Sequence, residues 1–377
     1  MDNQKHRLAQ KVESINLSTK RLIIGFDGFI DEIVHPIDKR LAIDQFTRID
    51  TISEFAKRID RASGLSTNIE LEPIQKKIGG NGPIMTNALG KHHPMITYIG
   101  TLGVPSIDPV FQEMGKSTEL ISISDCGHTD AYEFLDGKLL FGKMSGLNGL
   151  TYERLVEVVG EARLIELFDQ ADLFASVNWS MLPYMSDVWK KIQTNILPKT
   201  KKKKVKPLLF VDLADPEKRD PKVIREALAL LNGFQSFYRV ILGLNKKEAY
   251  EISHVLNLFD SDQLSQRQIA LKNLVTRIYQ AVDLDMVVIH PVECSAAMVK
   301  ENYQEESGPF CAHPVLTTGA GDNFNAGFVL GLLAGFDIEE ALWTGMATSG
   351  YYVRNATSPT TLELADFLHQ WADGKLS

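Results

Sequence analysis

Short apolar runs alternate with longer amphipathic runs along most of this chain. The apolar runs have the length of buried strands, and the amphipathic runs have the spacing of helices. Strands are predicted at 21–26, 95–100, 171–177, 208–213, 239–244 and 285–290. Helices are predicted at 151–168, 221–231, 246–257, 265–281, 323–334, 338–353 and 362–371. This alternation indicates an α/β fold with a central, mostly parallel sheet flanked by helices on both faces.

The region 27–145 does not follow this alternation. Asp136-Gly137 lies between two short strand-like segments, which is a hairpin signal, and residues 63–78 look irregular. We therefore expect one α/β domain over 1–377 that carries a small β sheet acting as a lid. An ordinary edge hairpin is the alternative. The lid elements are expected at about 28–78 and 128–145.

Composition narrows the class of protein. The chain has 377 residues and a net charge of -8, which argues against a nucleic-acid partner. Its three cysteines, Cys126, Cys294 and Cys311, have no metal-ligand spacing and suit a reducing compartment. No segment has the roughly 18 apolar residues of a membrane span, so no membrane partner is expected. We expect a cytoplasmic protein.

The most informative stretch is Thr317-Thr318-Gly319-Ala320-Gly321-Asp322, which leads into an apolar helical run. A glycine-rich turn at a helix start directs backbone N–H groups and the positive end of the helix dipole to one point. That point suits a phosphate, and a carboxylate beside it can take a proton from a hydroxyl. Helix capping by the aspartate is the structural alternative. The stretch predicts phosphoryl transfer to an alcohol.

Two further motifs stand at helix starts. Asn245-Lys246-Lys247-Glu248 follows a predicted strand and has the spacing of a capping box. The functional alternative is that both side chains face a ligand at the strand's end, with Glu248 holding Mg²⁺ through water. Gly79-Gly80-Asn81 precedes a short helix and is either a tight turn or a second site facing a polar ligand.

Acidic residues follow two predicted strands. Asp27 and Asp31 come after the first strand and can accept hydrogen bonds from neighbouring sugar hydroxyls, although Asp27-Gly28 also suits a turn. Asp212 and Asp215 come after the strand at 208–213, where Asp215-Pro216 is typical of a helix start.

In their order along the chain, these motifs resemble those of the ribokinase-like (PfkB) carbohydrate kinase family, over about residues 21–370. The resemblance implies a β lid over a sugar and transfer of the terminal phosphoryl group of ATP, with Mg²⁺, to a hydroxyl. Lids in that family can pair two subunits, so a homodimer through the lid is one expectation. The implied catalytic residues are Asp322 as the base and the amides of Gly319, Ala320 and Gly321 as the anion hole. The implied cofactor-binding residues are Asn245, Glu248 and Thr318, the first two also organising the metal. The implied substrate-binding residues are Gly79, Gly80, Asn81 and Asp31, with Asp27 as a rival of Asp31.

The chain departs from the family pattern at three places. Leu316 stands where an acidic residue often helps to coordinate a monovalent cation, so that cation is not carried over. Val292 and Ser295 occupy the positions of a Gly-x-x-Gly loop near the nucleotide, so the contacts there must differ. Ile84 replaces an asparagine of the glycine motif, which points away from a simple pentose.

Three hypotheses follow. The leading one is a kinase of a sugar or sugar-like alcohol. The second is a nucleoside kinase similar to adenosine kinases, and the third is a non-catalytic sugar sensor on a kinase fold.

Overall fold

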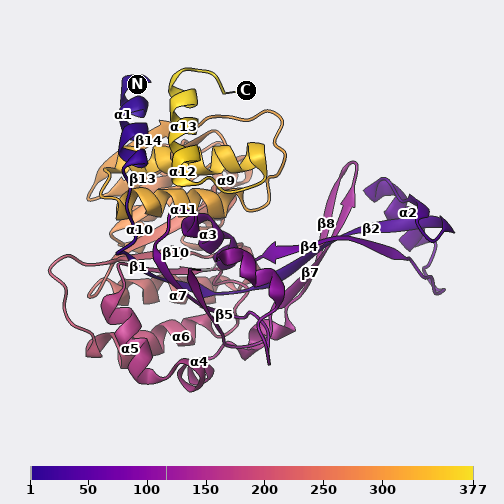
Figure 1. Cartoon of the computed structure of the whole chain (residues 1–377), viewed down its shortest axis with the longest axis horizontal. Helices are drawn as coiled ribbons and strands as arrows, with labels where there is room; N and C mark the ends of the chain where they lie inside the picture. The colour runs from indigo at the N-terminus through magenta and orange to yellow at the C-terminus, as the bar shows by residue number, and fades with distance from the viewer. Residues whose placement is uncertain (1, 116, 377) are drawn as a thin grey trace.

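The computed structural model describes residues 2–115 and 117–376. A nine-stranded sheet with helices on both faces forms the body, and a narrow arm of strands projects from its side (Figure 1). The strands lie in the order β14-β13-β12-β11-β10-β9-β1-β5-β6. All neighbours from β12 to β6 are parallel, and only β13 and β14 are antiparallel. The predicted α/β fold with a mostly parallel sheet is confirmed.

The central strands lie where the apolar runs predicted them. The strands of the large sheet are β1 Arg21–Phe26, β5 Met95–Gly100, β6 Thr118–Ser122, β9 Leu173–Val177, β10 Leu208–Asp212, β11 Arg239–Leu244, β12 Met286–Ile289, β13 Cys294–Val299 and β14 Asn302–Ser307. Predicted and observed bounds coincide for β1, β5 and β11, because these strands are buried on both faces. The strands β6, β13 and β14 were missed, and the edge strands β6 and β14 are only partly buried and carry polar residues.

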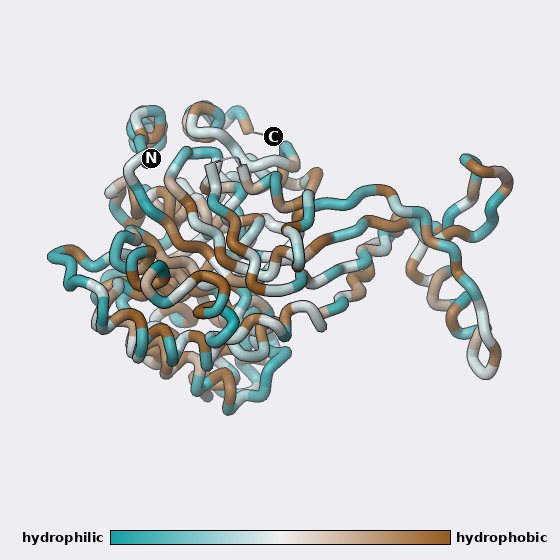
Figure 2. The backbone as a smooth tube through the Cα atoms, turned by 60° about the horizontal axis from the view of Figure 1, so that its bottom comes forward, coloured by the Kyte–Doolittle hydropathy of each residue, from teal (hydrophilic) through white to brown (hydrophobic). Residues whose placement is uncertain are grey.

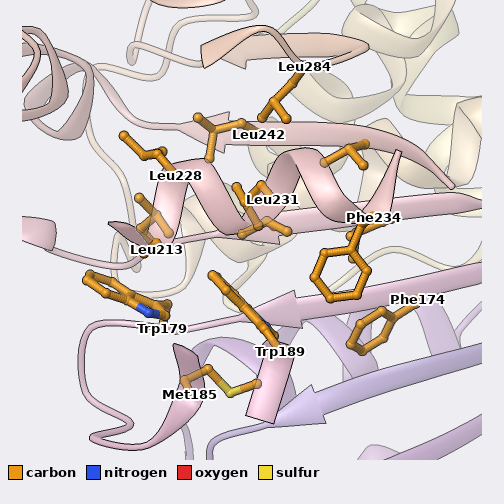
Figure 3. Close-up of a cluster of buried hydrophobic side chains, with 14 of the residues drawn as sticks. Phe174, Trp179, Met185, Trp189, Leu213, Leu228, Leu231, Phe234, Leu242 and Leu284 are labelled. Atoms are coloured by element: carbon orange, nitrogen blue, oxygen red, sulfur yellow. The ribbon is translucent and has the colours of Figure 1, made fainter. Parts of the chain in front are cut away.

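Alternate residues of the sheet face two separate cores. Leu22 and Ile24 of β1 pack with one helix layer: α1 Asp2–Glu13, α3 Asn81–Gly90, α11 Ala320–Leu333, α12 Ile338–Asn355 and α13 Thr361–Ala372. Ile23 packs with the opposite layer: α4 Tyr152–Val159, α5 Glu161–Gln170, α6 Met185–Lys191, α7 Pro221–Phe234, α8 Lys246–Val255 and α10 Leu271–Val282. Trp179, Trp189 and Phe234 fill the second core (Figure 3). Both faces of the sheet are therefore covered.

Two helical expectations were wrong, and the helices α1, α6 and, in the arm, α2 Ile52–Asp60 were not expected. The helix expected at 151–168 is broken at Gly160, whose φ of 86° is left-handed and ends α4. The helix expected at 265–281 is two helices, α9 Ser261–Gln266 and α10, separated after Arg267 in the left-handed region. The helix α1 was not expected, although Leu8 and Val12 lie one turn apart and are fully buried on its contact with α13.

The projecting arm is the expected small β sheet. Its strands are β2 Phe29–Ala42, β3 Gln45–Arg48, β4 Leu71–Gly79, β7 Gly127–Phe134 and β8 Gly137–Lys143. The long strand β2 pairs with β4, β3 and β7, so it is the spine of the arm, which Figure 2 shows as thin strands leading to a small tip. At that tip, α2 Ile52–Asp60 packs Phe55 against Phe134. Residues 71–78 are part of β4, so the expectation of an irregular segment there was wrong.

The predicted hairpin is present with a shift in its turn. Phe134 pairs with Gly137, so the two turn residues are Leu135 and Asp136. The turn carboxylate of Asp136 accepts the backbone N–H of Ile52, which fastens the hairpin to α2. In the described part of the chain, no helix is long and apolar enough to cross a membrane.

Candidate active site

The glycine-rich turn forms the start of α11. Gly319 is the residue before the helix, with φ of 90°, a conformation that other residues rarely adopt. A side chain there would also meet the Tyr352 hydroxyl at 3.0 Å. The helix begins at Ala320, three residues before the predicted start, so Asp322 lies in its first turn. The N–H of Ala320 donates to the carbonyl oxygen of Thr317 over 3.1 Å, so one of the three predicted anion-hole amides already has a partner.

Asp322 is buried and faces a second helix start. The side-chain amide of Asn81 donates to its Oδ1 over 2.9 Å. Burial raises the pKa of Asp322 well above its ordinary value, the negative charge of Asp212 raises it further, and the Asn81 hydrogen bond opposes both. These surroundings make the Asp322 carboxylate a stronger proton acceptor than an exposed aspartate.

The glycine motif at the end of β4 brings Asn81 to this position. Gly80 precedes α3 with φ of 93°, and α3 begins at Asn81, earlier than predicted. A side chain on Gly82 would lie 2.3 Å from the Tyr98 hydroxyl, so this helix start packs directly on the sheet. The close packing explains why small residues occupy this stretch.

Asp27 and Asp31 have different surroundings. Asp27 is fully buried, and its carboxylate accepts the backbone N–H groups of Asn81 and Gly82 at 2.9 Å each. The Asn178 amide donates to it over 2.7 Å. Asp31 lies on β2 where the arm leaves the body, beside Gly79, and is only partly buried. Asp27 therefore secures the start of α3, and Asp31 is the less buried of the two acids.

Asn245 and Glu248 form the predicted capping box at the start of α8. The Asn245 side chain accepts the Glu248 N–H over 3.0 Å, and the Glu248 carboxylate accepts the Asn245 N–H over 2.9 Å. Both residues also line a cavity that contains Asp322. Capping and ligand binding are thus compatible readings of this motif.

Asp212 completes an acidic group that the sequence analysis did not assign to the site. It ends β10, accepts the Asn325 side-chain amide over 2.8 Å, and lines the same cavity as Glu248 and Asp322. Burial raises the pKa of all three carboxyls, and their mutual repulsion adds to the rise for Glu248 and Asp322. Its position at the end of a parallel strand was the available signal. Asp215 begins the short helical turn at Pro216, as predicted.

This acidic group fits a hydrated divalent cation. In the described ranges, no group of three His, Cys, Asp or Glu is arranged to hold a metal ion directly. Mg²⁺ keeps much of its water and needs only one or two protein carboxylates. The positive charge of such a cation reduces the repulsion between buried carboxylates.

The cavity measures about 420 Å³ and joins the predicted motifs. It brings together Asn81, Asn245, Glu248, Ala320, Gly321 and Asp322. Its further lining includes Asp212, His290, Pro291, Val292, the segment from Gly308 to Cys311, Pro314 and Thr317. The lining does not include Asp27, Asp31, Gly79, Gly80, Thr318 or Gly319. A polar acidic end and an apolar rim of Pro309 and Phe310 suit a ligand with a charged and an apolar part.

Known proteins resemble this chain in sequence and in fold. The family model for prokaryotic ketohexokinase matches residues 2–371. The ketohexokinase of Haloferax volcanii is 29% identical over 356 residues, which is 94% of this chain and 92% of that protein. Arabidopsis thaliana ribokinase complexed with ribose and ATP has a TM-score of 0.62 at 15% identity, covering 93% of this chain and 98% of that one. Methanocaldococcus jannaschii nucleoside kinase has a TM-score of 0.57 at 13% identity, with the same coverage. The two solved structures show the fold alone.

Proposed function

The chain belongs to the prokaryotic ketohexokinase family and is a carbohydrate kinase, and on this premise we propose that it transfers the terminal phosphoryl group of ATP to a hydroxyl of a ketohexose. The observation that carries the proposal is the match of the family model to residues 2–371. This match favours a catalytically active kinase over a non-catalytic sugar sensor. Nucleosides remain as competing acceptors in the test.

Asp322 is the proposed general base. It takes the proton of the acceptor hydroxyl as that oxygen bonds to the γ-phosphorus, while the bond from phosphorus to the β,γ-bridging oxygen breaks and ADP leaves. Its raised pKa supports this role, because a more basic carboxylate takes the proton more readily. Asn81 orients the carboxylate through the 2.9 Å hydrogen bond.

The turn before α11 is the proposed anion hole. Gly319 and Gly321 let a phosphate approach the backbone, and amides in the first turn of a helix have no partner in a preceding turn. Thr318, which belongs to the same turn, is also a proposed cofactor-binding residue. Because Ala320 N–H is bonded to Thr317, we assign the larger share of the charge stabilisation to Gly321 and the helix dipole.

The proposed metal site consists of Glu248, Asn245 and Asp212. Bound there through water, Mg²⁺ would neutralise the charge of the donor phosphates. Glu248 supports the assignment, because burial and the neighbouring Asp212 raise its pKa without a basic partner to relieve them.

The arm is the proposed sugar lid, and residues 1–377 act as one kinase domain. Asp31 lies where the arm meets the body, beside Gly79, and is the proposed acceptor of sugar hydroxyl hydrogen bonds. On the edge strand β8, Leu140 is 64% exposed and Phe141 is 47% exposed. These apolar side chains support a homodimer through the lid, which sedimentation analysis would test.

The decisive experiment is an acceptor panel. The purified chain is incubated with ATP and Mg²⁺ and with ketohexoses, aldohexoses, pentoses or nucleosides, and ADP release is measured. We expect the highest kcat/KM for a ketohexose. A higher value for a nucleoside would support the nucleoside kinase instead, and no turnover with any acceptor would overturn the proposal.

A further inference from the structure

His290 is the first residue after β12 and is held firmly against α11. Its imidazole stacks on the ring of Phe324, with centroids 4.6 Å apart and planes inclined by 24°. Phe324 lies in α11 two residues after Asp322. The packing fixes the imidazole at the wall of the cavity that Asp322, Glu248 and Asn245 also line.

One nitrogen of this ring has no partner. In the described part of the chain, Nε2 of His290 is buried and makes no hydrogen bond. Buried polar atoms in folded proteins nearly always have a partner, so an unpaired one at a cavity wall needs an explanation. Burial lowers the pKa of His290 to about 4, so the ring is neutral at physiological pH and carries a single N–H.

The ring lies beside the glycine turn. A Cβ on Gly321 would lie 3.4 Å from Cε1 of His290, the ring carbon bonded to both nitrogens. The loop after His290 contains Val292 and Ser295. Val292 is 79% exposed and Ser295 is fully buried. His290 therefore brings a polar side chain next to Gly321.

We propose that Nε2 of His290 donates a hydrogen bond to a phosphate oxygen of the nucleotide and helps to hold the phosphate chain over the start of α11. The inference rests on the proposed function, because it takes the cavity to be the nucleotide site. The acidic side chains of the cavity repel a phosphate, so a neutral donor fixed by an aromatic stack is a suitable partner. His290 thus binds the nucleotide, which is the phosphoryl donor, through its side chain.

Two variants separate the hydrogen bond from the packing. His290→Phe keeps a ring against Phe324 but has no N–H. His290→Gln loses the ring but can place an amide N–H near the position of Nε2. His254→Gln is the matched control, because His254 is an exposed residue of α8 outside the cavity lining.

The readouts are calorimetric Kd values for ADP and steady-state KM values. We expect His290→Phe to weaken ADP binding roughly tenfold, as for a lost hydrogen bond to a charged group. KM for ATP should rise in parallel and KM for the ketohexose should not change, while His290→Gln recovers most of the affinity. Unchanged ADP binding in His290→Phe would overturn the proposal, as would a parallel loss of sugar binding and thermal stability.

Magnesium distinguishes a direct phosphate contact from one through the metal's water. The direct contact predicts the same loss of ADP affinity with and without Mg²⁺. A loss that appears only with Mg²⁺ would overturn it. Because ADP binding is measured without turnover, a parent protein that binds ADP but phosphorylates no ketohexose would refute the proposed acceptor while still testing His290.

Discussion

The side-chain amide of Asn81 donates a hydrogen bond to Oδ1 of Asp322 over 2.9 Å. The two residues lie in the first turns of different helices, α3 and α11, and both line the cavity. The starts of two helices thus converge on one carboxylate. This contact joins the glycine motif near the arm to the glycine turn that is proposed to hold the phosphate.

Replacing Asn81 with alanine tests this contact through the pH dependence of turnover. The hydrogen bond lowers the pKa of Asp322 against burial and the charge of Asp212, so its loss raises that pKa further. The base acts as the carboxylate, so the acidic limb of the kcat profile should move to higher pH. We expect kcat to fall roughly tenfold on that limb and to recover at alkaline pH.

Asn87→Ala is the control, since Asn87 lies in the same helix outside the cavity lining. A loss of kcat that is equal at all pH values would contradict the assigned role of Asn81.

Asp322→Asn tests the base itself. Asparagine has nearly the shape of aspartate and can still accept the hydrogen bond from Asn81, but it cannot take a proton from the acceptor hydroxyl. We expect kcat to fall ~10²–10⁴-fold, with ATP and sugar binding largely retained. Because the change removes a buried charge near Asp212 and Glu248, the melting temperature should stay equal or rise, which excludes misfolding as the cause. Asp262→Asn on the exposed α9 is the control, and turnover at the parent rate would refute the assignment.

The sequence was sufficient for the parts of the site that follow strands and open helices. The apolar run of β11 places Asn245 at the strand's carboxyl end, where parallel strands bring ligand residues together. The glycine-rich turn at Gly319 predicts both the start of a helix and the close approach of a ligand to the backbone. At these positions the local sequence pattern and the proposed role point to the same residues.

Contacts between distant segments were not visible in the sequence. Asp212 belongs to the site because Asn325, 113 residues away, fixes its carboxylate. Asp27 and Asp31 look alike as acids after a strand, and only the docking of α3 buries Asp27 and leaves Asp31 accessible. The sequence around His290 does not indicate a role for this residue, and only the structure shows that its ring stacks on Phe324. In each case, packing between segments decides the role.

Asp31→Asn is expected to weaken sugar binding without affecting the nucleotide. Burial raises the pKa of Asp31, and a hydrogen bond from Thr129 and the charge of Lys77 oppose that rise, so the carboxylate is placed to accept hydroxyl hydrogen bonds. We expect KM for the ketohexose to rise roughly tenfold and KM for ATP to remain constant. Asp130→Asn is the control, because its carboxylate pairs with Lys143 on the arm. If both KM values rise together, Asp31 acts on the fold rather than on the sugar.

Asp27 predicts a pH dependence of stability. Burial raises its pKa to about 6, although hydrogen bonds from Asn178, Gly82 and Asn81 oppose the rise. A carboxyl whose folded-state pKa exceeds its unfolded value of 3.8 stabilises the fold below that value, and the contribution is lost as pH rises towards 6. Asp27→Asn removes this titration and leaves one acceptor oxygen for three donors. Measured by denaturant unfolding, the stability advantage of the parent over Asp27→Asn should therefore shrink between pH 4 and pH 7, by on the order of 3 kcal/mol.

Glu133→Gln is the control of opposite sign for that measurement. The ion pair with Lys138 lowers the pKa of Glu133, so its contribution to stability is present above its unfolded value and is lost as pH falls. The advantage of the parent over Glu133→Gln should therefore shrink towards acidic pH, and it should be small because the pair is partly exposed. An advantage over Asp27→Asn that grows with pH would mean that Asp27 is stabilised as the carboxylate, and its three hydrogen bonds would then outweigh the cost of burial.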